Sequence, residues 1–357
     1  MWRSMSLAFG VAFVGVLALA GDRGHSQGGL AYGPNDAPNL YKFTYGWAKL
    51  PDRRKWGAVV SIDIDRDGKS VWVFDRCEDA RSCAKSTLDP IMKFDETGKL
   101  VKSFGGGMIN FSHGLHVDKD NNIWVSDAAA ENNGKGHTVM KFNQDGKLLM
   151  TLGKPGVAGT TQDTFNAPSD ILMAPNGDIF VADGHGGDTN NRIVKFDKDG
   201  KYIKEWGKKG KGPGEFDVPH SLAMDSAGRL FVADRSNNRL QIFDKDMNYL
   251  DSWHHFGRPS GIAILKDDTL IVGDSESGRA LDGPSIAPEG GGAAFRNVGW
   301  RQGIRIGSAK DGSLHHFIDG TNPEGIGADE RGTIFAGLTT GIGVSKSGGA
   351  VQKWVRK

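Results

Sequence analysis

Three side chains that can bind a metal ion recur at equivalent places in a repeated pattern. His113 lies in SHGLHVD, His220 in PHSLAM and Glu324 in PEGIGA, each at the start of an apolar stretch. Two imidazoles and one carboxylate with open coordination positions form a catalytic set for zinc, and the same set serves non-haem iron. The alternative is that each histidine is structural and hydrogen-bonds a neighbouring repeat. Two histidines and a glutamate in register favour a divalent metal, with zinc as the first choice and iron as the second.

Three further polar side chains follow the second apolar stretch of their repeats. Arg76 comes after FD, His185 after ADG and Arg235 after AD. Two guanidinium groups suit a carboxylate or another anionic oxygen group, and an imidazole can take a proton near neutral pH. We therefore predict that these three residues are catalytic. The alternatives are that each arginine ties down its own loop and that His185 only decorates the loop GHGGDTNNR.

The elements that must position these residues are short strands in tandem repeats. Four segments share one pattern, as in IMKFDETGKLVKSFG and IVKFDKDGKYIKEWG. Their phenylalanines, Phe94, Phe142, Phe196 and Phe243, are 48, 54 and 47 residues apart. Each segment is preceded by an alternating apolar stretch such as DIFVAD or RLFVAD. Two hairpins in every 40 to 50 residues, approximately, are typical of a four-stranded propeller blade.

The repeats predict an all-β, six-bladed β-propeller over residues 57–357. Similar hairpins at 60–75 and 324–338 bring the number of inner hairpins to six. A Gly-rich insertion at 278–303 interrupts blade five after its second strand. This insertion is either a lid over the mouth of the ring or a surface loop.

Ring closure leaves two candidates for one strand. Residues 40–50, in the N-terminal segment 21–56, resemble an outer strand, and residues 350–355 compete with them for that role. Closure by either segment would remove an exposed sheet edge.

A six-bladed ring brings the metal-binding candidates together. In a blade, the first strand starts and the second strand ends at the same end of the ring, because the two are antiparallel neighbours. His113, His220 and Glu324 fall on blades two, four and six, which are related by turns of about 120°. We expect these side chains to converge near the axis at one mouth, which they share with the three catalytic candidates.

The blades resemble NHL repeats, and two stretches are similar to the peptidyl-α-hydroxyglycine α-amidating lyase family. These are PHSLAMDSAGRLFVADRSNNRLQIF at 219–243 and SDILMAPNGDIFVADG with NNRIVKFDKDGKYIKEWG within 169–207. The resemblance covers residues 57–338 and is most specific in blades two to four. It implies a six-bladed propeller with a central metal that cleaves a carbinolamide C–N bond to give an amide and glyoxylate.

The resemblance implies metal ligands. The positions of His113 and His220 are zinc-binding histidines in the family, whereas the family's third histidine corresponds to Glu324. Glutamate can also bind zinc. The family's structural calcium uses an aspartate at the place of Gly325, so we do not expect calcium on the axis.

The resemblance also implies catalytic roles. Arg76 and Arg235 match family positions that hold the peptide substrate and support the reaction. The family's catalytic tyrosine falls at His185, where an imidazole would take over the role of the base.

The first residues and the composition indicate an exported protein. Residues 1–20 carry Arg3 and an apolar run that ends in small residues, which is typical of a cleavable signal peptide. With 44 basic and 43 acidic residues, the chain has no charge excess that would favour nucleic acid or an anionic membrane as a partner. In a secreted or periplasmic protein, we expect Cys77 and Cys83 to form a disulfide rather than to supply a thiol nucleophile.

These observations predict an exported, metal-dependent, lyase-like enzyme that acts on a small hydroxylated or carboxylate-bearing substrate. The substrate would be a small molecule or a peptide, and we expect a monomer without membrane insertion. The alternative is a non-enzymatic NHL-repeat propeller that binds a protein or peptide on its face. A lactonase-like calcium hydrolase is disfavoured, because it needs several axial carboxylates or asparagines and Glu324 alone fits.

Overall fold

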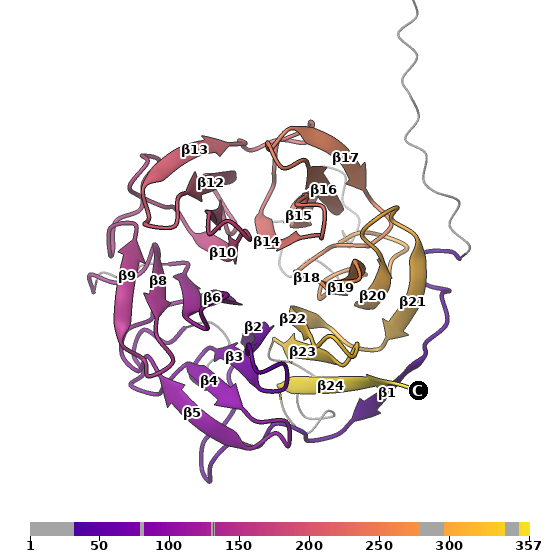
Figure 1. Cartoon of the computed structure of the whole chain (residues 1–357), viewed down its shortest axis with the longest axis horizontal. Helices are drawn as coiled ribbons and strands as arrows, with labels where there is room; N and C mark the ends of the chain where they lie inside the picture. Colours follow the sequence, from indigo (N-terminus) through magenta and orange to yellow (C-terminus); the bar gives the residue numbers. More distant parts are fainter. Residues whose placement is uncertain (1–31, 79–81, 130, 132, 279–295, 340–349) are drawn as a thin grey trace, which may run out of the picture.

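The computed structural model describes residues 32–78, 82–129, 131, 133–278, 296–339 and 350–357. Over these residues the protein is built from six four-stranded sheets arranged around a central axis (Figure 1). The prediction of an all-β, six-bladed propeller is confirmed. The predicted signal peptide at 1–20 and residues 279–295 of the blade-five insertion lie outside the described residues.

The first three blades follow the chain from the innermost to the outermost strand. Blade one contains β2 (Val59–Ile64), β3 (Val71–Asp75), β4 (Ile91–Phe94) and β5 (Leu100–Phe104). Blade two contains β6 (Ser112–Val117), β7 (Ile123–Asp127), β8 (Thr138–Phe142) and β9 (Leu148–Leu152). Blade three contains β10 (Pro168–Met173), β11 (Ile179–Asp183), β12 (Arg192–Phe196) and β13 (Tyr202–Trp206).

The last three blades complete the ring. Blade four contains β14 (Pro219–Met224), β15 (Leu230–Asp234), β16 (Arg239–Phe243) and β17 (Tyr249–Trp253), with a short 3₁₀ turn, η1 (Arg235–Asn237), after β15. Blade five contains β18 (Gly261–Ile264), β19 (Thr269–Asp274), β20 (Gly303–Ser308) and β21 (Leu314–Asp319). Blade six contains β22 (Pro323–Ala328), β23 (Ile334–Leu338), β24 (Val351–Arg356) and β1 (Tyr41–Thr44).

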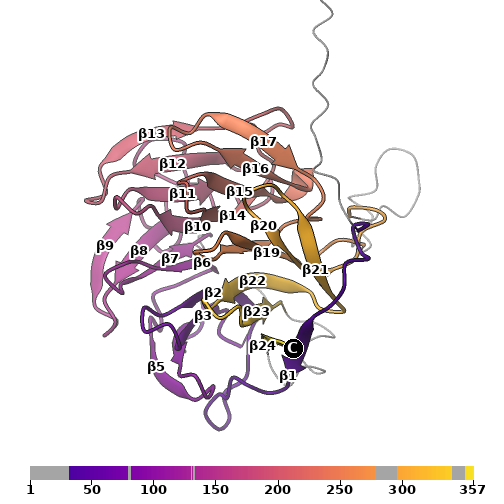
Figure 2. The same ribbon diagram turned by 45° about the vertical axis from the view of Figure 1, so that its right-hand side comes forward.

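Both segments that competed for ring closure take part in it. Strand β24 is the third strand of blade six, and β1 pairs with it as the outer strand, from Tyr41 opposite Arg356 to Thr44 opposite Lys353. Figure 2 shows the two strands side by side at the C-terminus. The N- and C-terminal parts of the described chain are therefore held together by one sheet, and this pairing covers the edge that β24 would otherwise expose.

The core lies between the blades. Six apolar clusters are present among the described residues, and each of them joins two neighbouring blades. Every residue of β3, β7, β11, β15 and β23 is buried, so these second strands read as continuous apolar runs. The four repeated phenylalanines end the third strands and are at most 4% exposed, which explains why their spacing marks the blades.

No helix among the described residues is long and apolar enough to span a membrane.

Candidate metal centre

Irregular strand starts aim three side chains at the axis. The ladders between the first and second strands shift register from Ser112 to Leu115 in blade two, from Pro219 to Leu222 in blade four and from Pro323 to Gly325 in blade six. His113, His220 and Glu324 lie within these shifts. A bulge of this kind turns a side chain out of the regular alternation of a strand. In a regular strand these three side chains would point to a face of the blade. The bulges turn them toward the axis instead.

The predicted ligands meet, and a fourth residue joins them. His113, His185, His220 and Glu324 each offer one ligand atom, and these atoms all lie within 4.8 Å of one another. The ring centroids of His113 and His220 are 4.6 Å apart, and those of His113 and His185 are 4.2 Å apart. His113, His220 and Glu324 are 2%, 3% and 7% exposed. We call these four residues the axial cluster.

Backbone carbonyls of the neighbouring blades orient two of the imidazoles. The Nδ1 atom of His113 lies 2.6 Å from the carbonyl oxygen of Ser169, and Nδ1 of His220 lies 2.7 Å from that of Ser260. A carbonyl oxygen can only accept, so each Nδ1 carries the proton and donates it. Each Nε2 atom then presents a lone pair. Both Nε2 atoms are buried without a hydrogen-bond partner among the described residues, which is the arrangement of a metal-binding histidine held by its other nitrogen.

Glu324 lies so close to His220 that a cation or a proton is needed between the carboxylate and the ring. Its Oε1 atom lies 3.1 Å from Nε2 of His220 and 3.3 Å from Nη1 of Arg235, and its Oε2 atom accepts a hydrogen bond of 2.9 Å from Oγ of Ser275. A neutral imidazole whose Nδ1 is the donor places a lone pair opposite this carboxylate oxygen. Two acceptors so close together need a cation or a proton between them. The residues present therefore fit a divalent metal.

The protonation states also suit metal binding. Burial is the main cause that lowers the pKa of His113 and His185 well below the usual value, and burial likewise lowers the pKa of His220. Burial alone would raise the pKa of Glu324, but His220, Arg235 and His113 outweigh it and hold this pKa well below the usual value. Near neutral pH the cluster thus offers neutral imidazoles and an ionised carboxylate, the forms that ligate metals.

The two arginines border the cluster. Arg76 is buried, its Nε donates to the carbonyl oxygen of Ser112 over 3.1 Å, and its guanidinium lies 4.0 Å from the ring centroid of Phe111. The Phe111 ring stacks on His113 with centroids 6.2 Å apart. Arg235 reaches the cluster directly through Glu324. The structure therefore places both arginines where sequence reasoning expected them, at the end of the ring that holds the metal candidates.

His185 lies at the mouth where the sequence analysis placed it, but closer to the predicted ligands than its predicted role required. It was predicted as a proton acceptor in the loop after β11, but its ring contacts both other imidazoles, with the His220 centroid 5.3 Å away. The geometry allows two roles, a fourth ligand or a base beside the ligands. His185 follows a strand of blade three, which is outside the pattern of blades two, four and six. The pattern of alternate blades therefore did not indicate His185 as a metal ligand.

Buried aspartates hold the chain just before the strand starts, and sequence reasoning missed this role. Asp127 accepts hydrogen bonds from the backbone N–H groups of Asn110 and Phe111, ahead of His113. Asp234 accepts one from Asp217, ahead of His220. Equivalent bonds occur in three further blades at Asp75, Asp183 and Asp274. The signal was visible as the aspartate that ends each repeated apolar stretch, in FVAD for example.

The predicted disulfide is present. Cys77 and Cys83 are bonded, and the backbone N–H of Cys77 donates to Asp75. The disulfide therefore closes the loop that directly follows Arg76.

Gly325, next to Glu324, packs closely against blade one. A Cβ atom built on Gly325 would lie 2.7 Å from Cα of Ser61 in blade one. A side chain at this place would therefore require the neighbouring backbone to shift.

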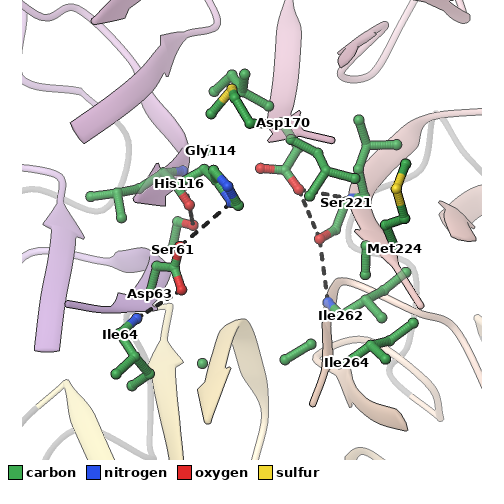
Figure 3. Close-up of a pocket in the computed structure, with 18 of the residues that line it drawn as sticks. Ser61, Asp63, Ile64, Gly114, His116, Asp170, Ser221, Met224, Ile262 and Ile264 are labelled. Carbon is green, nitrogen blue, oxygen red and sulfur yellow. Dashed lines mark hydrogen bonds and ion pairs between the residues drawn. The ribbon is translucent and has the colours of Figure 1, made fainter. Parts of the chain in front are cut away.

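A cavity extends from the axial cluster along the axis. It has a volume of about 820 Å³, and the first strands of all six blades line it. His113, His220 and Glu324 form one end, and exposed turn residues such as Arg66, Lys119 and Glu330 line the other. Figure 3 shows Ser61, Asp63 and His116 on one side of this cavity and Asp170 and Ser221 on the other. Its size is that of a typical ligand pocket.

Comparisons with known proteins agree with the fold. The family described as a 6-bladed beta-propeller matches residues 159–255. A gluconolactonase structure from Xanthomonas campestris has a TM-score of 0.58 and 15% identity, over 91% of this chain and 97% of that chain. At this identity the likeness concerns the fold alone.

Two curated relatives differ in what their names say. NHL repeat-containing protein 3 from Homo sapiens is 32% identical over 201 residues, which are 55% of this chain and 54% of the relative. A probable peptidyl-alpha-hydroxyglycine alpha-amidating lyase from Caenorhabditis elegans is 37% identical over 141 residues, 38% of either chain. The matches thus span about half of these relatives' length or less.

Proposed function

We propose that this NHL-repeat six-bladed β-propeller, which has amidating lyases among its homologues, is a metal-dependent lyase-like enzyme. Its substrate is a small hydroxylated or carboxylate-bearing molecule or peptide that binds at the end of the ring where the axial cluster lies. The observation that carries the proposal is the meeting of His113, His185, His220 and Glu324, whose ligand atoms all lie within 4.8 Å of one another.

The ligand set fits zinc best and iron second. His113, His220 and Glu324 supply two imidazoles and one carboxylate, and Ser169, Ser260 and Ser275 hold them from behind. Three protein ligands leave coordination positions for a substrate oxygen. A bound divalent ion would stabilise negative charge on that oxygen and lower its pKa.

The remaining residues of the site act on the substrate. Arg76 and Arg235 offer two guanidinium groups beside the cluster, which suits a carboxylate on the substrate. A ring nitrogen of His185 takes the proton of the substrate hydroxyl. In a carbinolamide, the C–N bond then breaks, the hydroxyl carbon becomes the aldehyde carbonyl of glyoxylate, and the leaving nitrogen takes up a proton as the amide.

Turnover by matched histidine variants tests this assignment. The parent should convert an α-hydroxyglycine peptide to amide and glyoxylate, or act on a simpler α-hydroxy acid. His185→Ala should keep the metal and lose turnover, whereas His315→Ala, an exposed histidine on β21, should change neither. Loss of metal from His185→Ala would instead make His185 a fourth ligand. A parent that holds metal but turns over none of these substrates would contradict the lyase assignment.

We also propose that the protein is exported to an oxidising compartment. The Cys77–Cys83 disulfide and the amidating lyase relatives support this location. Intact-mass measurement of exported protein should find a chain that starts near Gly21 and contains no free thiol.

The second candidate is a binding propeller without enzymatic activity. NHL repeat-containing protein 3 is among the relatives, and its name states no activity. This candidate predicts a metal-free parent whose His113 and His220 variants affect no small-molecule turnover.

A further inference from the structure

The axial cluster is bordered by different charges on its two sides. On the side of the mouth lie Arg76 and Arg235, and both guanidinium charges act on the cluster histidines. On the other side lies the axial cavity, of about 820 Å³, which includes His113, His220 and Glu324 in its wall. These three residues therefore belong both to the axial cluster and to the wall of the cavity. A metal ion or a substrate can therefore approach the cluster from two sides, past the two arginines or through the cavity.

The interior of the cavity carries carboxylates. Asp170, 8% exposed, accepts hydrogen bonds from the backbone N–H of Leu222 over 2.8 Å and from Oγ of Ser221 over 2.9 Å. Asp63 accepts one from the backbone N–H of Val117 over 2.8 Å. Figure 3 places these two carboxylates on opposite sides of the hollow. These three donors are neutral groups, so they leave the charge of Asp170 without a basic partner, whereas Asp63 also lies 3.5 Å from Nδ1 of His116, whose pKa is lowered by burial.

Other buried aspartates of the protein are paired differently. Asp183 and Asp234 form ion pairs with Arg192 and Arg239 over 2.9 and 2.7 Å. Within the described residues, no lysine or arginine forms an ion pair with Asp170, the charged group closest in effect being the carboxylate of Asp63. Carboxylates toward the exposed end of the cavity are paired with basic side chains, as Asp118 is with Lys141 and Asp225 with Arg229, so the unpaired negative charge of the lining lies deeper, at Asp170. A cation is therefore drawn inward past the rim, whereas the arginine side repels it.

We propose that the axial cavity is the route by which a hydrated divalent cation reaches the axial cluster, and that Asp63 and Asp170 attract it on the way. The proposal rests on the metal centre of the proposed function. The two ends of the ring then have different roles. An anionic substrate approaches past Arg76 and Arg235. The metal ion enters at the opposite end, where the first and second strands of each blade are joined by a turn.

Rates of metal loading test the route, and final metal content tests the centre. Apo protein, prepared with a chelator, is mixed with Co²⁺ at pH 8, where Asp170, whose pKa burial raises to about 7, is mostly ionised, and uptake is followed by the visible absorbance of the bound ion. Asp170→Asn and Asp63→Asn keep the hydrogen-bond acceptor and remove one charge each. Asp188→Asn, an exposed aspartate in the loop on the mouth side, is the matched control. Ala263→Trp, in the cavity wall on β18, narrows the path without a change of charge.

If the cavity is the route, the cavity variants should take up Co²⁺ more slowly than the parent but reach the same final metal content. Asp170→Asn and Asp63→Asn should load about threefold to tenfold more slowly than the parent at low salt, and the difference should shrink as ionic strength rises. Ala263→Trp should also slow loading, and Asp188→Asn should match the parent. Parent loading rates in Asp170→Asn, Asp63→Asn and Ala263→Trp, or equal slowing in Asp188→Asn, would overturn the route while the metal centre stands. A parent that takes up no Co²⁺ would overturn both.

Discussion

Replacement of Asp170 by asparagine should make the stability of the protein less dependent on pH. Burial is the main cause that raises the pKa of Asp170 from 3.8 to about 7, and the nearby Asp63 carboxylate adds to it. Because the folded pKa lies above the unfolded one, the protein is destabilised as the pH rises between these values. The loss is absent below the unfolded pKa and complete above the folded one. Asparagine is neutral throughout and keeps an acceptor for the backbone N–H of Leu222.

The magnitude follows from the size of the shift. At about 1.4 kcal/mol per pKa unit, a rise from 3.8 to about 7 lowers the free energy of unfolding by about 4 kcal/mol at pH 8. At pH 5 the same relation leaves about 1.6 kcal/mol of this loss. The free energy of unfolding of Asp170→Asn, relative to the parent, should thus increase by about 3 kcal/mol between pH 5 and pH 8.

Urea unfolding of both proteins at several pH values measures this difference directly. A comparison at matched pH removes the contributions of other titrating groups, provided that these are shared. Asp188→Asn serves as the exposed control, and its stability relative to the parent should stay nearly constant with pH. Parallel pH profiles for the parent and Asp170→Asn would refute the reasoning, because they would mean that Asp170 titrates alike in both states.

Three further outcomes are expected. Replacement of Cys77 and Cys83 by serine should lower the free energy of unfolding by about 2 kcal/mol in urea, because the bond closes a short loop; an unchanged midpoint would contradict this. Ser275→Ala removes the hydroxyl that donates to Glu324, so zinc affinity in a chelator competition should fall about tenfold or more, and equal affinity would speak against the supporting role. Arg235→Ala should leave the metal content intact and lower kcat/KM on an α-hydroxy acid by about 30-fold or more, whereas loss of the metal would assign the arginine to the ligands.

The sequence allowed the ring and three members of the cluster to be predicted. Repeated phenylalanines mark the third strands because each one is buried between blades, and this regularity made the equivalent strand starts comparable. His113, His220 and Glu324 could then be placed on alternate blades. The prediction worked because it depended on repeat register alone.

The remaining features depend on contacts between blades, which repeat register does not encode. The carbonyl groups of Ser169 and Ser260 orient the histidines through the backbone, so no residue type announces this role. Repeat register placed His185 at the mouth, but its contact with both other imidazoles depends on the path of the loop after β11, which no pattern specifies. Blade six is completed by β24 and β1 from opposite parts of the described chain, and repeats compared in chain order do not show this pairing.

The most direct test of the central claim is the metal content of the protein purified without chelator and without a histidine tag. The parent should contain close to one divalent ion per chain, with zinc as the expected metal. His113→Ala and His220→Ala should each abolish this content while the fold is retained, because removal of one of three protein ligands destroys the chelate. A folded parent that contains no metal, or histidine variants that keep the full content, would contradict the account.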